Sequence, residues 1–130
     1  MKFLLDTHIF LWFINGDARL PAGWRDTIRQ PHHDVYLSVV SLWETILKYQ
    51  LGKLPLPEPP DRYLPAQRER HQIANLSLDE ASVQRLATLP PIHRDPFDRM
   101  LVCQAIELNM TIITVDDVFR AYPLPILERA

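Results

Sequence analysis

The stretch Thr111-Ile112-Ile113-Thr114-Val115 decides the fold, because a β-branched residue occupies every position and Asp116-Asp117 follows directly. β-Branched side chains favour strands, and a strand without regular polar alternation is typical of a parallel sheet covered on both faces. A second apolar run, Phe3-Leu4-Leu5, stands near the start of the chain and also ends at an acid, Asp6. The two runs predict buried parallel strands that place carboxylates at the same edge of a sheet.

Helix and strand patterns alternate along the rest of the chain. Helices are expected over residues 7–15, 21–30, 41–51, 78–89 and 96–108, with a charged helical piece around 67–71. Further strands are expected over residues 35–38 and 73–76, and an edge strand over 125–128. Five prolines make residues 54–65 an extended connector. The alternation implies right-handed crossovers between parallel strands, so the predicted fold class is α/β, a three-layer α/β/α domain with a central, mostly parallel sheet.

The size and composition suit one compact domain spanning residues 1–130, because 47% of the residues are hydrophobic and the chain is too short for two ordinary domains. The formal net charge of −2 weakens the case for a nucleic-acid partner without excluding it, since acids in one site can mask local basic strips. The lone Cys103 cannot form an internal disulfide, which suits a reducing compartment. Asp6, Thr7 and His8 interrupt the apolar N-terminus and no stretch approaches a membrane span, so we expect a cytoplasmic protein without a membrane segment.

Four acidic residues lie where a strand-like run gives way to a helix, or one turn inside a helix: Asp6, Glu44, Asp98 and Asp116. Carboxylates gathered at one edge of a sheet repel each other strongly unless a divalent cation sits among them. Mg²⁺ and Mn²⁺ prefer such oxygen ligands, and they support phosphodiester cleavage by activating water and neutralising charge. The sequence contains no P-loop, no dinucleotide-binding glycine fingerprint and no paired-cysteine zinc motif. A hard-metal site for phosphodiester chemistry is therefore the leading prediction.

Each acid also has a purely structural explanation. Asp6 could cap the helix that starts near Thr7. Glu44 lies three residues after Ser41, which fits a capping box, and four residues before Lys48, which fits an ion pair. These explanations are independent of one another, whereas a metal site accounts for all four acids together.

The two remaining acids have acidic neighbours that compete for the same roles. Asp95 suits the cap of the helix that Pro96 opens, which leaves Asp98 free to face a cleft. Asp116 and Asp117 end a strand and begin a turn, so one of them is expected to be a cap and the other is available to the site.

Four motifs follow one another in a distinctive order. They are Leu-Leu-Asp-Thr-His at residues 4–8, Ser-Leu-Trp-Glu-Thr at 41–45 with Lys-Tyr-Gln-Leu-Gly-Lys-Leu at 48–54, His-Arg-Asp-Pro-Phe-Asp-Arg-Met-Leu at 93–101, and Thr-Val-Asp at 114–116. This order resembles the PIN-domain ribonucleases, particularly the VapC-type toxins of bacterial toxin–antitoxin pairs. The likeness runs from Phe3 to about Tyr122, and the segment from His93 to Asp98 is its most specific part.

The resemblance implies an endoribonuclease that uses one or two Mg²⁺ ions, or Mn²⁺ in their place, and leaves 5′-phosphate and 3′-hydroxyl ends on RNA. It also implies a toxin restrained by a cognate antitoxin protein. The implied catalytic residues are Asp6, Glu44, Asp98 and Asp116, with Asp6, Asp98 and Asp116 as metal ligands and the hydroxyls of Thr7 and Thr114 in support. The family pattern Thr-x-Asp favours Asp116 as the fourth acid, which makes Asp117 the predicted cap.

Two other functions stay open on the sequence. One is a PIN-type nuclease that acts in RNA processing or on DNA without an antitoxin, and the other is a catalytically idle interaction module that keeps the fold. Retention of all four acids argues against the idle module. Several basic residues either contact RNA phosphates or are ordinary solvated side chains: Lys48, Lys53, His93, Arg94 and Arg99. The other histidines, at positions 8, 32, 33 and 71, show no zinc-binding spacing.

The segment Ile9-Phe10-Leu11-Trp12-Phe13-Ile14 places apolar side chains all round a helix, because successive residues are about 100° apart. A small domain with one sheet cannot cover every side of such a helix. We therefore expect part of this surface, joined by Trp43 and Leu47, to form a homodimer interface or a groove for an apolar antitoxin segment. The alternative is a central helix that the domain's own later helices cover.

Overall fold

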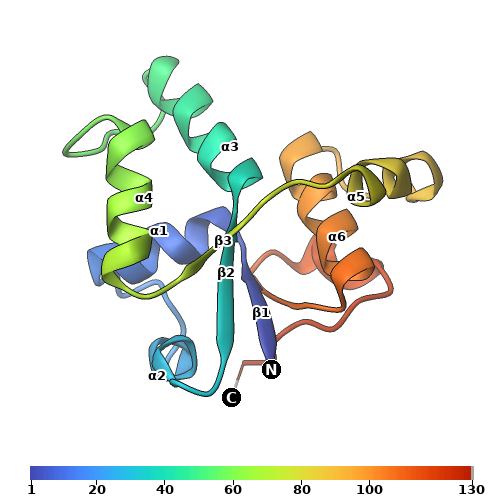
Figure 1. Cartoon of the computed structure of the whole chain (residues 1–130), viewed down its shortest axis with the longest axis horizontal. Coiled ribbons are helices and arrows are strands. Elements are labelled where there is room, and N and C mark those ends of the chain that lie inside the picture. The colour runs from blue at the N-terminus through green and yellow to red at the C-terminus, as the bar shows by residue number, and fades with distance from the viewer. Residues whose placement is uncertain (130) are drawn as a thin grey trace.

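A computed structural model describes residues 1–129 of the chain (Figure 1). The strands are β1 (Lys2–Leu5), β2 (Asp34–Ser38), β3 (Ala74–Leu76) and β4 (Thr111–Ile113). The α-helices are α1 (Thr7–Asn15), α2 (Trp24–Arg29), α3 (Val39–Gln50), α4 (Pro60–Arg70), α5 (Glu80–Arg85) and α6 (Pro96–Leu108). Short 3₁₀ helices cover Leu86–Thr88 and Asp117–Ala121. No helix within residues 1–129 is both long enough and apolar enough to cross a membrane.

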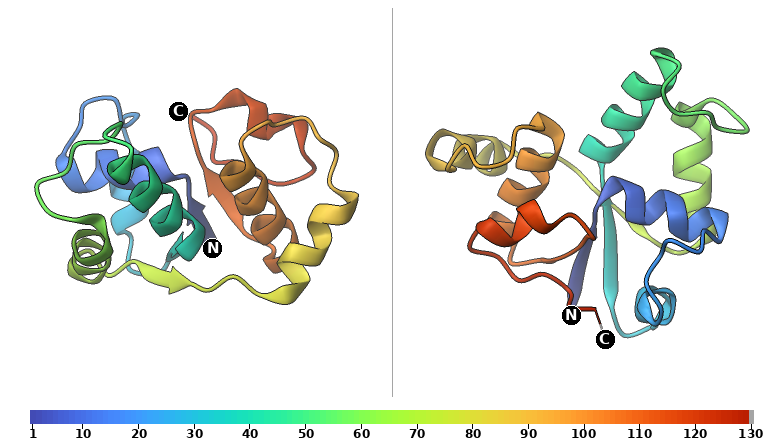
Figure 2. Two further views of the ribbon diagram at one scale, coloured as in Figure 1. Left: turned by 90° about the horizontal axis from the view of Figure 1, so that it is seen from above. Right: turned by 180° about the vertical axis from the view of Figure 1, so that it is seen from behind.

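The strands form one sheet in the order β3-β2-β1-β4, and all three neighbouring pairs are parallel. Helices α1, α2 and α4 lie on one side of the sheet, and α5 and α6 lie on the other (Figures 1 and 2). This arrangement confirms the predicted three-layer α/β/α fold. The chain builds outward from β1 to β3 and then returns to place β4 on the other side of β1, so the strand order reverses between β1 and β4. The carboxyl ends of strands at such a reversal are where open α/β sheets bind ligands.

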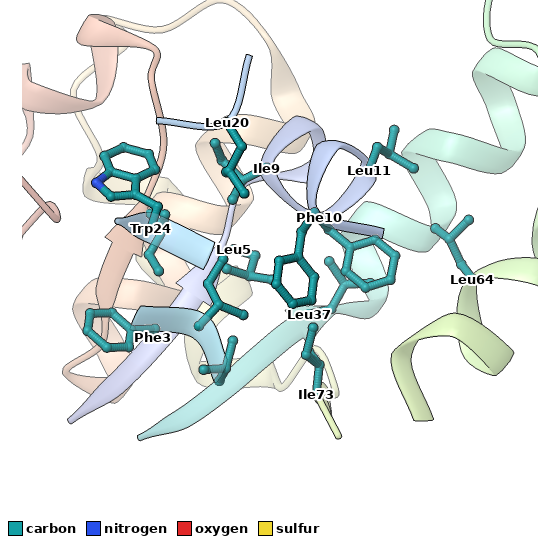
Figure 3. Close-up of a cluster of buried hydrophobic side chains, with 14 residues drawn as sticks. Phe3, Leu5, Ile9, Phe10, Leu11, Leu20, Trp24, Leu37, Leu64 and Ile73 are labelled. Atoms are coloured by element: carbon teal, nitrogen blue, oxygen red, sulfur yellow. The ribbon is translucent and has the colours of Figure 1, made fainter. Parts of the chain in front are cut away.

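Two apolar cores cover the two faces of the sheet. The first packs α1 and α2 against β1 and β2, and Figure 3 shows its side chains filling the space between α1 and the strands; its largest members include Phe3, Phe10, Phe13 and Trp24. The second packs α6 and the C-terminal segment against the other face, with Leu4, Leu101, Ile112 and Phe119 fully buried.

The prediction that α1 has more apolar surface than the domain can cover is wrong for most of the helix. Ile9, Phe10, Leu11 and Phe13 are buried, and Trp12 and Ile14 are partly buried against the same core. The physical reason is that α1 lies among α2, α3, α4 and the sheet, which cover it from several sides (Figure 2). The two residues on α3 that were expected to join this surface, Trp43 and Leu47, are both exposed.

Helix α3 begins two residues earlier than predicted, at Val39, because the hydroxyl of Ser38 accepts a hydrogen bond from the Val40 N–H at 3.0 Å. Ser41 is therefore already inside the helix, and its predicted capping box with Glu44 is wrong. Helix α6 has the predicted bounds, and β4 covers the first three residues of its predicted strand.

Helix α4 starts at Pro60, so half of the predicted connector over residues 54–65 is helical. Pro60 occupies the first helical position, where a missing N–H costs nothing. Pro65 removes one backbone bond from the helix interior, but the adjacent Leu64 is buried in the first core and holds the turn in place.

Other boundaries differ by smaller amounts. Helix α2 is shorter than predicted and begins after Gly23, whose positive φ of 87° ends the preceding turn. Asp79 caps α5 as predicted, through a bond from the Ser82 N–H. The predicted edge strand over residues 125–128 forms only one isolated parallel bridge, between Ile112 and Ile126, so β4 lies near the edge of the sheet rather than at its centre.

Candidate active site

The predicted acids meet in a hollow of about 360 Å³ at the carboxyl ends of β1 and β4. All four of Asp6, Glu44, Asp98 and Asp116 line it. The other lining residues are His8, Trp12, Arg19, Lys48, Asp95 and Val115.

Asp6 follows β1 and is 6% exposed. It occupies the cap position of α1, yet its side chain makes no bond to the helix, so the capping explanation is wrong. Instead, the Thr114 hydroxyl donates to Asp6 Oδ2 at 2.7 Å. The same hydroxyl accepts a bond from the Asp116 N–H at 3.0 Å, which ties the ends of β1 and β4 together.

Glu44 projects from α3 and is 2% exposed. The Thr7 hydroxyl donates to its Oε1 at 2.8 Å, and Thr7 Oγ1 lies equally close to Ser41 Oγ. Lys48 Nζ, one helical turn later, lies 2.5 Å from Glu44 Oε2. The predicted ion pair is therefore present, and it lies in the wall of the acidic hollow.

Asp95 caps α6 as predicted, since its Oδ1 accepts bonds from the N–H groups of Phe97 at 2.8 Å and Asp98 at 3.1 Å. This leaves the Asp98 carboxylate free to face the hollow. Asp116 was predicted to serve the site while Asp117 served as the cap, but Asp116 does both. Its Oδ1 accepts the capping bond of the last 3₁₀ helix from the Val118 N–H, and its Oδ2 remains available to the site. Asp117 is exposed beside Arg120, so its predicted role as the cap is wrong.

His93 is the site residue whose place the sequence did not indicate. Its Nε2 lies 3.0 Å from Asp98 Oδ2 and 3.1 Å from Asp116 Oδ2. Its Nδ1 accepts a bond from the Asp95 N–H at 3.2 Å, which assigns the ring proton to Nε2, between the two carboxylates. The sequence showed that His93 adjoins the best motif, but nothing in a loop pattern tells which way the ring points.

The electrostatics of the hollow are those of crowded carboxylates. Burial, followed by the charges of Asp6, Asp95, Glu44 and Asp116, raises the pKa of Asp98 to about 8. Burial also raises the pKa of Asp6, and its hydrogen bond from Thr114 only partly opposes this. Burial and the charges of neighbouring acids therefore both disfavour the ionised forms of Asp6 and Asp98.

The donor set fits a divalent cation. Among residues 1–129, one group of three has the spacing of a metal site, because atoms of His93, Asp98 and Asp116 all lie within 4.8 Å of one another. With its proton on Nε2, His93 donates to the two carboxylates in this arrangement and leaves them as the available ligands. Asp6, a predicted ligand, is not part of that tight group, although its charge acts on Asp98. Carboxylate oxygens dominate the hollow, which suits a hard cation.

The other basic residues of the sequence analysis lie in different environments. Arg94 and Lys53 are exposed, whereas Arg99 is partly buried on α6. His8 and Arg19 also line the hollow, and the Arg19 guanidinium is paired with Asp17 at 2.7 Å.

Comparison with known proteins gives a consistent result. The sequence matches the PIN domain family over residues 3–124. A segment of 57 residues is 39% identical to Ribonuclease VapC16 of Mycobacterium tuberculosis, and it covers 44% of this chain and 40% of that relative's length.

Solved structures share the fold over almost the entire chain. VapBC2 of Rickettsia felis, bound to a DNA fragment from its promoter, gives a TM-score of 0.74 at 19% identity, with 98% of each chain covered. VapBC-1 of nontypeable Haemophilus influenzae gives 0.69 at 20% identity, again with 98% of each chain covered. FitAcB of Neisseria gonorrhoeae gives 0.64 at 19% identity, covering 98% of this chain and 97% of the other.

Proposed function

The chain belongs to the PIN domain family, and from that premise we propose that it is a metal-dependent endoribonuclease. The observation that carries the proposal is the convergence of Asp6, Glu44, Asp98 and Asp116 on one hollow at the reversal of strand order. Burial and neighbouring acids raise the pKa values of Asp6 and Asp98, so gathering these carboxylates here is unfavourable unless a cation offsets their charge. The partial match to a protein named as a ribonuclease supports RNA as the substrate.

We assign Mg²⁺ to the site, with Mn²⁺ as the alternative, held by Asp6, Asp98 and Asp116. When bound, the cation would lower the pKa of water and offset the charge of the scissile phosphate. Thr7 and Lys48 fix the position of the Glu44 carboxylate in the lining of the hollow. From there Glu44 can orient a water, or complete the ligand set through a water. The Nε2–H of His93 fixes the spacing of Asp98 and Asp116.

Lys48 supplies positive charge beside the acids, whereas the Arg19 guanidinium is already paired with Asp17 at 2.7 Å. Lys48 is 35% exposed, so its ammonium reaches both Glu44 and the open hollow. Arg19 lies over one face of the Trp12 ring at 5.1 Å, and Trp12 also lines the acidic hollow, so the other face of this indole is the one on which we propose that a base stacks.

The decisive experiment is to map new 5′-phosphate ends across total RNA after incubation with purified protein. We expect discrete cleavage with Mg²⁺, and none with Asp98→Asn or in excess chelator. A single-stranded DNA of matched sequence, run in parallel, tests the alternative of a DNA nuclease. Unchanged cleavage in excess chelator would exclude the metal mechanism and return attention to the histidines.

We also propose a cognate antitoxin as partner, since VapBC complexes share this fold. A homodimer stays a prediction. Trp43 and Leu47 on α3 and Leu51 at its C-cap are exposed and lie about one helical turn apart, so they offer an apolar face for it. Trp43 is 60% exposed. Replacing it with Ser should lower the dimer fraction or the antitoxin affinity, measured by light scattering after size exclusion. If the folded variant keeps both properties, this face is not the partner surface.

A further inference from the structure

A second polar hollow lies at the opposite end of the strands, near their amino ends. It has a volume of about 200 Å³ and is bounded by the end of α2, the amino end of β2 and the end of α4. Nitrogen-bearing side chains dominate its lining: Arg29, Gln30, His33, Arg70, His71 and Gln72. No carboxylate is among its lining residues, which is the reverse of the acidic hollow.

Two of these groups share an aromatic support that restricts their positions. The Phe13 ring lies edge-on to the His71 ring at 5.0 Å, and the Arg29 guanidinium lies 5.9 Å from the centre of the same ring. Arg25 packs over Phe13 as well, at 5.0 Å, and donates to the Phe13 carbonyl at 3.0 Å. Because Phe13 is buried in the first core, these cationic groups converge on a rigid base rather than on a mobile loop.

The positive charges of this hollow lack anionic partners. Within residues 1–129, Arg25, Arg29 and Arg70 form no ion pair, whereas Arg19, Arg85 and Arg120 each contact a carboxylate. Asp26 lines an adjoining hollow together with Arg29, and Asp34 stands between His33 and Val35 in the sequence without lining the pocket.

The two histidines of the pocket are partly buried beside other cationic groups. Burial lowers the pKa of His71, and Arg70, Arg29 and Arg25 lower it further. Burial and then the charges of His32 and the N-terminal amine lower the pKa of His33. In addition, His33 Nδ1 is buried without a hydrogen-bond partner. A buried polar atom of this kind costs free energy unless a ligand or water satisfies it.

We infer that this basic hollow, the Arg29–Arg70 pocket, binds a phosphate group. Guanidinium groups present paired N–H donors that match phosphate oxygens, and the Gln30 and Gln72 amides add neutral donors at the rim. The phosphate can belong to a small phosphorylated compound or to the backbone of an RNA that extends beyond the acidic hollow. Both sources offer the same chemistry to the pocket.

The first test uses inorganic phosphate and pyrophosphate as probes, titrated at constant ionic strength and followed by amide NMR shifts. We expect shifts confined to residues 28–35 and 70–72, and at least a tenfold weaker affinity in Arg29→Gln/Arg70→Gln. Arg62→Gln is the matched control, because Arg62 is an exposed arginine two turns earlier on α4 and does not line the pocket. Equal affinity in the double variant, or shifts that map elsewhere, would overturn the inference.

The second test identifies the source of the phosphate. A single-stranded oligoribonucleotide is titrated in excess chelator, so that it stays intact. If its affinity falls in the double variant by a factor similar to that for pyrophosphate, the pocket binds an RNA backbone phosphate. If only the pyrophosphate affinity falls, the pocket serves a small phosphorylated compound. If neither falls in the folded variant, with folding checked by circular dichroism, the pocket does not bind phosphate.

Discussion

The two edges of the sheet carry opposite charge and hold it in different ways. At the carboxyl edge, each acid has its own support: Thr114 holds Asp6, Thr7 and Lys48 hold Glu44, and His93 spans the other two. At the amino edge, the cationic groups rest on an aromatic ring and have no carboxylate partner within residues 1–129. The acids are organised at fixed spacings, whereas the cations only share a surface.

This contrast shows why the net charge of −2 says little about partners. Strands of three to five residues, at about 3.3 Å per residue, keep the two edges roughly 10–17 Å apart. The net charge adds the charges of an acidic region and a basic region that lie apart in space, so the two nearly cancel in the sum although each presents its own field to a partner. The two edges can be separated experimentally, because one should control catalysis and the other only binding.

The largest loss of activity is expected from replacing Asp116, whose carboxylate His93 holds in the acidic hollow. Asp116→Asn should lower kcat/KM for RNA by at least about a hundredfold, because it removes a proposed ligand while the amide can still cap the 3₁₀ helix. Asp117→Asn should stay within about twofold, since that side chain is exposed and only adjoins Arg120. Initial rates on a fluorogenic RNA measure both variants. The reverse ranking would move the fourth ligand by one residue.

A smaller effect should follow from removing the histidine between two acids. His93→Ala should weaken Mn²⁺ affinity by about 10–100-fold, because Asp98 and Asp116 lose the donor that sets their spacing. His93→Gln, whose amide N–H can reach a similar position, should recover most of the affinity. Titration calorimetry with Mn²⁺ reports this without any RNA, and His32→Ala, an exposed change at the other edge, is the control. Equal Mn²⁺ affinity in wild type and His93→Ala would remove His93 from the site.

Features of the site that depend on neighbouring residues in the sequence could be predicted, whereas features that depend on tertiary contacts could not. The Asp95 cap, the free Asp98 and the end of β1 at Asp6 follow from short-range rules, and the structure confirms them. The double role of Asp116, with one oxygen for a cap and one for the hollow, depends on which way a 3₁₀ turn rotates the carboxylate.

Other features depend on contacts that no local pattern encodes. The ring of His93 is oriented by the Asp95 N–H and by edge-on packing against Phe119, which is distant in sequence. The helix through Pro65 exists because Leu64 is buried in the core. The basic pocket joins α2 to the end of α4, and its residues are far apart along the chain.

The crowding of the acids should also appear in stability. The Asp98 carboxyl has a folded pKa of about 8 against 3.8 for the free group, so the native state binds more protons between these two values. Stability of the cation-free protein should therefore fall as the pH rises through this window, and the full loss is present above it. Asp98→Asn removes this dependence and should stabilise the cation-free protein by about 1–3 kcal/mol at the alkaline end.

Thermal unfolding in excess chelator at several pH values measures this prediction. The difference between Asp98→Asn and wild type should grow with pH and vanish near the acidic end of the window. Added Mg²⁺ should reverse the order, because it stabilises only the protein that retains its ligands. A variant that is less stable than wild type at every pH would mean that Asp98 is well compensated in the native state.

The smallest effect tests whether the two edges are independent. Arg29→Gln/Arg70→Gln should leave kcat/KM on a dinucleotide with a single phosphodiester within about twofold of wild type, because its one phosphate lies among the acids during cleavage and no second phosphate is left for the basic pocket. On a long RNA, the same variant should raise KM and leave kcat unchanged if the Arg29–Arg70 pocket holds a backbone phosphate, since binding there is uniform between substrate and transition state. Comparing the two substrates by steady-state kinetics separates these outcomes. A fall in kcat on the dinucleotide would show that the basic pocket shapes the acidic hollow, and the two regions would then have to be treated as one coupled site.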